Sequence, residues 1–95
     1  MRMSKLISRP IDPRDPRWEV WRPTYRVYFW RPVSPTGWGS REFEVSGGDI
    51  VAILDWAERH ADDGETFTVF VVVGEGDRLG LVRLAGDDPT RASDT

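Results

Sequence analysis

Hydrophobic and polar positions follow a regular pattern in four segments of the chain, and each pattern predicts a β-strand. The most apolar segment runs from Thr66 to Val73, where β-branched and aromatic residues stand at both odd and even positions. A run of this kind indicates a strand that is buried on both faces of a sheet. Three further strands are predicted at residues 24–31, 40–45 and 79–84, which are rich in alternating apolar side chains.

The segment between the second and third strands has the spacing of a helix instead, from about Asp49 to Ala61. Its apolar side chains recur three and four positions apart and form one stripe. That stripe consists of Ile50, Ile53, Leu54, Ala57 and Ala61. Trp56 and His60 lie on its flank. Asp49 is suited to capping the first amides and Gly64 to ending the helix in a left-handed conformation.

These elements predict an α+β fold, a two-layer ββαββ sandwich with one helix on one face of a four-stranded antiparallel sheet. The strand order should be 2-1-3-4, because the two most apolar strands, 24–31 and 66–73, belong at the centre of the sheet. The order 1-2-3-4 would place a charged strand there. Residues 1–17 are predicted to be a flexible arm rich in Pro and Arg, residues 18–86 a single domain, and residues 87–95 a disordered acidic tail.

One helix can cover only one side of the sheet, and both sides are predicted to be apolar. The helix side is assigned Val27, Phe29, Phe43, Val45, Phe67, Val69, Val71 and Leu81. The other side, called here the aromatic face, carries Tyr28, Trp30, Phe70 and Val72. Burying four such side chains is worth about 6–12 kcal/mol. Whole domains are stable by only about 5–15 kcal/mol, so we expect this face to be covered.

Three different groups could bury the aromatic face. The arm could fold back over it, since Trp18, Val20 and Trp21 are apolar residues in a polar segment. A second copy could pack sheet on sheet and form a homodimer, or another protein or a ligand could bind there. The expected function is therefore a small protein–protein interaction or accessory module that associates with itself. The residues expected to form the interaction surface are Tyr28, Trp30, Trp38, Phe70 and Val72, with Trp18 and Trp21 as cover or competitor.

Charge is divided unevenly along the chain and suggests an alternative. Residues 1–41 carry nine Lys and Arg against three Asp and Glu, or +6, and residues 42–95 carry four against thirteen, or −9. Arginine beside exposed aromatic residues on a sheet binds single-stranded nucleic acid by phosphate contact and base stacking. That alternative site would use Arg26, Arg31, Tyr28 and Trp30. The net charge of −3 and the single Lys argue against it.

Few residues offer catalytic or metal-binding chemistry. The chain has no Cys, which excludes disulfides, thiolate zinc sites and thiol catalysis. His60 is the only His, and its place in the last helical turn favours a structural role through the helix dipole. We therefore expect no enzymatic activity, no cofactor and no metal site. Without a signal-peptide pattern or a long apolar run, a cytoplasmic location and no membrane partner are also expected.

Two short motifs resemble a known family. Trp30-Arg31-Pro32 and Pro35-Thr36-Gly37-Trp38 are similar to the W-x-P and P-x-G-W elements of MbtH-like proteins, which are small partners of adenylation domains in peptide synthetases. The likeness covers residues 25–61 and implies that Trp30 and Trp38 face a partner. No Ser-Leu precedes Trp30, and two further strands are predicted after the helix, so it is treated as a likeness and not as membership.

Overall fold

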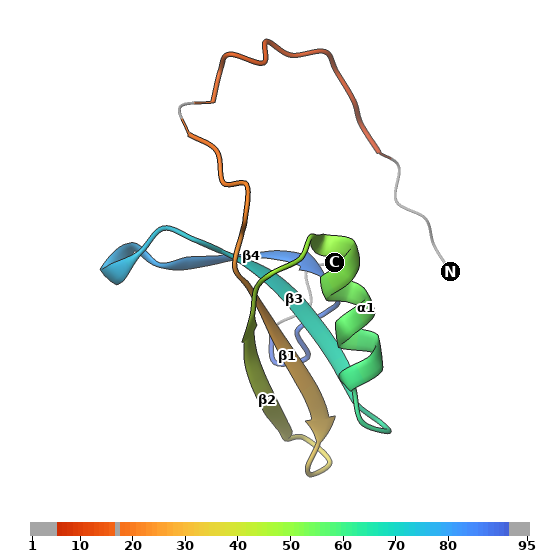
Figure 1. Ribbon diagram of the computed structural model, residues 1–95. Coiled ribbons are helices and arrows are strands. Elements are labelled where there is room, and N and C mark those ends of the chain that lie inside the picture. The colour runs from red at the N-terminus through yellow and green to blue at the C-terminus, as the bar shows by residue number, and fades with distance from the viewer. Residues whose placement is uncertain (1–5, 17, 92–95) are drawn as a thin grey trace.

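The computed structural model describes residues 6–16 and 18–91. Its elements are β1 (Tyr25–Pro32), β2 (Trp38–Val45), α1 (Ile50–His60), β3 (Thr66–Val73), the 3-10 helix η1 (Gly76–Arg78) and β4 (Gly80–Ala85). The sheet is antiparallel with the order β2-β1-β3-β4, and α1 covers one of its faces (Figure 1). The predicted α+β fold, its strand order and its single helix are confirmed.

The core lies between α1 and the two central strands. Every second side chain of β1 points into it, and Val27 and Phe29 are fully buried. Opposite them, Ile53 and Ala57 come from the apolar stripe of α1, one helical turn apart. Val69 completes the centre from β3. The period of two in the strand and of four in the helix therefore decide which residues form the core.

The ends of α1 are determined by local chemistry. The side chain of Asp49 accepts a hydrogen bond from the backbone N–H of Ala52 over 3.0 Å, which satisfies one of the free amides of the first turn. The N-terminal cap agrees with the sequence pattern. At the other end the cap is Ala61, whose backbone is extended and whose N–H donates to the carbonyl of Ala57. Gly64, with φ = +82°, lies in the turn that follows, so its assignment as the helix cap was wrong.

The pairing of β4 differs from the prediction in one respect. Val69 of β3 pairs with Ala85 and Phe70 pairs with Arg83, so β4 contains one extra residue, a β-bulge, between these two pairs. Before this bulge, in the part of β4 next to the hairpin turn, Val72 pairs with Leu81 and Val71 pairs with Val82. Leu81 lies on the aromatic face, so its assignment to the helix side was wrong. Alternation within β4 cannot show which of its two sides faces the helix, because the pairing register with β3 decides this.

Candidate interaction site

The aromatic face is already buried within one chain. Trp30 is 6% exposed and Phe70 is 8% exposed. Tyr28 lies between them, with ring centroids 5.9 Å from Trp30 and 5.1 Å from Phe70. Val72 is half-buried on the same side. The expectation that this face needs a cover from the arm, a second copy or a ligand is therefore corrected, and Trp30 does not face a partner as the likeness to MbtH-like proteins implied.

The segment after β4 supplies a contact on this face that the sequence analysis missed. The indole N–H of Trp30 donates to the hydroxyl of Thr68 over 3.0 Å, and that hydroxyl donates to the backbone carbonyl of Asp87 over 2.7 Å. Thr68 is fully buried, so each of these polar groups needs its partner. The predicted disorder of residues 87–95 stays a prediction, and residues 92–95 lie outside the described part of the chain.

Gly86 brings this segment close to β3. It has φ = +81°, and a Cβ at this position would lie 2.1 Å from the carbonyl oxygen of Phe67. Only glycine accommodates both the left-handed conformation and the close approach. The chain can therefore leave β4 and reach Thr68 on the other side of the sheet.

The arm is the most exposed apolar part of the described chain. Trp18 is 70% exposed, Val20 is 61% exposed and Trp21 is 86% exposed. The chain before β1 rises away from the sheet and then arches over (Figure 1). Residues 18–21 form no strand in a single chain. These side chains have the character of an unoccupied docking segment.

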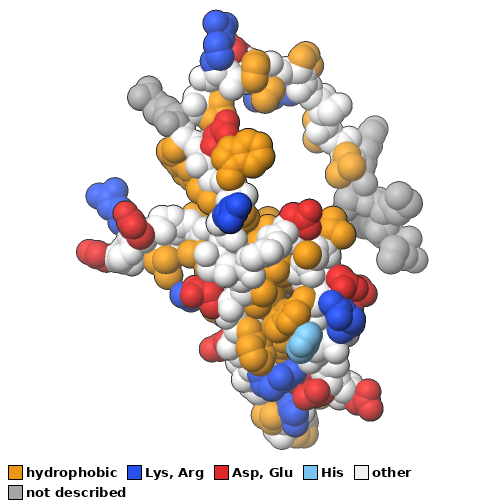
Figure 2. Space-filling model, in the orientation of Figure 1, with side chains coloured by type: hydrophobic (Ala, Val, Ile, Leu, Met, Phe, Trp, Pro, Cys, Tyr) orange, Lys and Arg blue, Asp and Glu red, His pale blue; other side chains and the backbone are white. Residues whose placement is uncertain are grey.

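Beside the free edge of β2 lies a second apolar surface, called here the aromatic shelf and formed by Phe43, Trp56 and His60. Phe43 is 39% exposed, and its ring centroid lies 5.7 Å from that of Trp56. The His60 ring stacks on Trp56 at 4.4 Å. Figure 2 shows the pale blue histidine next to hydrophobic side chains, with arginine close by. Trp38, at the start of β2, is 42% exposed, so this predicted interaction residue lies at the surface.

A buried carboxylate holds the shelf in position. Glu65, just before β3, is 1% exposed in its side chain and accepts two hydrogen bonds from Arg41 of β2, over 2.7 and 3.0 Å. These bonds, and a third from the backbone N–H of Asp62, outweigh burial and lower the pKa of Glu65 from 4.5 to about 2. The same pairing raises the pKa of Arg41. The Arg41 guanidinium also lies 4.8 Å from the ring centroid of Phe29 and 5.5 Å from that of Phe43.

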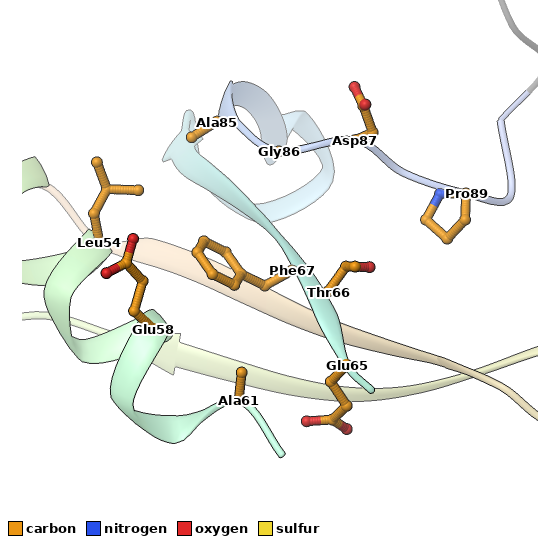
Figure 3. Close-up of a pocket in the computed structure, with 10 residues that line it drawn as sticks. All are labelled: Leu54, Glu58, Ala61, Glu65, Thr66, Phe67, Ala85, Gly86, Asp87 and Pro89. Carbon is orange, nitrogen blue, oxygen red and sulfur yellow. The ribbon is translucent and has the colours of Figure 1, made fainter. Parts of the chain in front are cut away.

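A pocket of about 610 Å³ lies at the start of β3, where β4 does not pair with it, between α1 and the segment after β4 (Figure 3). The Phe67 ring points into it, and Leu54 and Ala61 line the helix side. Glu58 and Asp87 stand on opposite sides. An apolar floor between two carboxylates suits an apolar group that carries positive charge. The sequence pattern does not predict this pocket, because its wall combines residues of α1 and β3 with Asp87 and Pro89 of the segment predicted to be a tail.

The two arginines proposed for nucleic-acid binding each lie near a carboxylate of the same chain. The guanidinium of Arg26 lies 3.7 Å from a carboxylate oxygen of Glu44, and that of Arg31 lies 3.9 Å from Glu65. Trp30 is buried and hydrogen bonded, so its ring is not free to stack on a base. Tyr28 is half-buried. Arg26, Tyr28 and Trp30 lie on the aromatic face, whereas Arg31 lies on the helix side of the sheet beside Glu65, so the four residues do not form one surface.

The described residues contain no group of three or more His, Cys, Asp and Glu side chains able to hold a metal ion. The Nδ1 atom of His60 lies 2.8 Å from the carbonyl oxygen of Trp56 within the same helix, which gives the ring a structural partner. In the part of the chain that the structure covers, no helix is long and apolar enough to cross a membrane. No protein-family model matches the chain, and neither a curated protein nor a solved structure shows significant similarity to it.

Proposed function

We propose that this protein is a small protein–protein interaction module that associates with itself and has no catalytic activity. The observation that carries the proposal is the exposure of Trp18, Val20 and Trp21, the apolar residues just before β1. Large apolar side chains grouped in this way mark an interaction segment. The aromatic face, which first suggested a homodimer, is replaced in this role because Trp30 and Phe70 are buried in one chain.

The energy available from the arm is of the size needed for association. Fully burying the three side chains is worth about 1.5–3 kcal/mol each, or about 4.5–9 kcal/mol together. A micromolar complex corresponds to about 8 kcal/mol. Ordering the arm consumes part of this gain. We therefore expect an association no tighter than micromolar and not a permanent assembly.

Support for a non-enzymatic role comes from the polar groups themselves. His60 is engaged with Trp56, and Glu65 is engaged with Arg41. The carboxylate of Glu65 is thus held ionised by a guanidinium, which removes it as a proton donor near neutral pH. Neither group combines a free proton-transfer atom with a neighbouring nucleophile, as acid–base or covalent catalysis requires.

Sedimentation equilibrium or light scattering on the full chain, over a concentration range across the micromolar region, tests this proposal. We expect a mass that rises from monomer to dimer. The double variant Trp18→Ser/Trp21→Ser should remain a monomer through the range. Val51→Ser is the matched control, because Val51 is also exposed (72%) but lies on the outer side of α1. A wild-type chain that stays monomeric at the highest concentration would refute self-association.

A further inference from the structure

We infer that the arm of one copy adds to the outer edge of β2 in a second copy, so that residues 18–22 become a fifth strand beside the aromatic shelf. The inference rests on the proposed self-association and names its interface. It joins two features of the structure that are incomplete in one chain. One is an exposed apolar segment that belongs to no strand, and the other is a sheet edge with no strand beside it.

The edge of β2 has the properties of a strand acceptor. Its eight residues pair with β1 on one side only, so the backbone groups that point to the other side have no strand to bond. Phe43 and Trp56 form a wall next to this edge, where the side chains of an added strand would pack. Addition of an extended segment to a free edge gains main-chain hydrogen bonds, and side-chain surfaces like this one give selectivity.

Arg22 cannot reach this edge in its own chain. The carbonyl of Thr24 accepts a hydrogen bond from the backbone N–H of Val72 over 2.9 Å, so the chain is still beside β3 at this residue. A strand added outside β2 would lie two strand spacings from β1, or about 9.5 Å. From Thr24 back to Arg22 the chain spans at most about 7 Å. Where Arg22 lies beside the edge of β2, that edge therefore belongs to another copy.

Charge complementarity selects a register for the added strand. In a parallel arrangement that places Trp21 beside Phe43, Arg22 falls beside Glu44 and Glu19 falls beside Arg41. Both neighbouring pairs then have opposite charge. The antiparallel arrangement with the same aromatic pair places Arg22 beside Glu42 but leaves Glu19 beside the uncharged Val45, so it gains one opposite-charge pair instead of two. Arg22 has no ion pair within the described residues, and Glu44 is 60% exposed with only a long contact of 3.7 Å to Arg26.

Other edges fit less well. Two β2 strands paired across a two-fold axis would bring Glu42 and Glu44 of one copy against the same residues of the other, and like charges on facing strands destabilise a sheet. The outer edge of β4 is interrupted by the register shift and carries Arg83. A basic residue at that edge would oppose Arg22 of the arm. The edge of β2 is thus the acceptor with both a continuous backbone and the matching charge.

A charge exchange between two variants tests the interface. Arg22→Glu places two repulsive Glu–Glu pairs in each dimer, and Glu44→Arg places two repulsive Arg–Arg pairs. We expect each variant alone to dimerise about tenfold or more weakly than the wild type, as measured by sedimentation equilibrium at low salt. An equimolar mixture restores opposite charge at both sites of a heterodimer. Its dissociation constant should return to within about threefold of the wild-type value.

A control and a second measurement keep the outcomes separate. Arg91→Glu makes the same change of charge after β4, outside the proposed interface, and should leave the dissociation constant unchanged. The absence of Cys allows a chemical test as well, because a disulfide requires Cα atoms within about 7 Å. A mixture of Val20→Cys and Glu42→Cys chains should form a mixed disulfide, whereas Val20→Cys and Val51→Cys chains should not. A wild-type dimer without charge rescue and without this cross-link would overturn the interface but leave self-association standing. A monomeric wild type would overturn both.

Discussion

Replacing Glu65 by Gln should remove a pH-dependent part of the stability of this domain. Glu65 is the carboxylate that joins the start of β3 to Arg41 of β2, with its side chain 1% exposed. Gln keeps the shape of the side chain but loses the negative charge that both guanidinium contacts require. The fold, the helix and the aromatic core should remain in place, because none of the core side chains changes.

The size of the effect follows from the pKa of Glu65. A fall of this pKa from 4.5 in the unfolded chain to about 2 in the folded chain corresponds to about 3 kcal/mol of stabilisation at pH values above 4.5. Because Arg41 is 36% exposed, solvent screening reduces this to about 1–2 kcal/mol. The pKa is lowered in the folded state, so the contribution is complete above pH 4.5 and is lost as the pH falls through the range down to about 2.

Urea denaturation followed by far-ultraviolet circular dichroism at a series of pH values measures this contribution. At neutral pH, Glu65→Gln should unfold with a free energy about 1–2 kcal/mol below the wild type, and the gap should close as the pH falls toward 2. Glu58→Gln is the matched control, because Glu58 is exposed on α1 and forms no ion pair among the described residues. Equal losses in the two variants at neutral pH, or a gap that does not depend on pH, would refute the reasoning.

Two further substitutions test the contact between the aromatic face and the segment after β4. Gly86→Ala forces a Cβ to within 2.1 Å of the carbonyl oxygen of Phe67 and should lower the free energy of unfolding by about 2 kcal/mol or more. Gly64→Ala, where φ is +82° and the space is open, should lower it by about 1 kcal/mol. Thermal unfolding compares the two variants, and equal losses of stability would show that the close approach at Gly86 is absent. Thr68→Val removes the hydroxyl that accepts from Trp30 and should cost about 1–3 kcal/mol in chemical denaturation, because the buried indole N–H loses its partner, and a neutral result would contradict that hydrogen bond.

Local patterns identified most of the elements because their information lies in neighbouring residues. The alternation in β1 shows which side chains face the core, since a strand turns by half a revolution at each residue. The stripe of Ile53 and Ala57 does the same for α1, and the cap at Asp49 follows from one side chain and an amide three residues later. The strand order also followed, because burial on both faces requires a central position in the sheet.

The identity of the exposed surface was decided by tertiary contacts between distant residues. Trp30 and Thr68 are 38 positions apart, and Arg41 and Glu65 are 24 positions apart, so no local period connects them. The sequence after Gly86 predicts an acidic tail, yet the backbone carbonyl of Asp87 accepts a hydrogen bond from Thr68. Every residue has such a carbonyl, so the sequence gives no sign of this contact. Sequence alone determined which side chains are apolar and at what spacing they recur along the chain. Only the fold decided which of them are covered, because a cover is made by backbone and side chains that arrive from elsewhere in the chain.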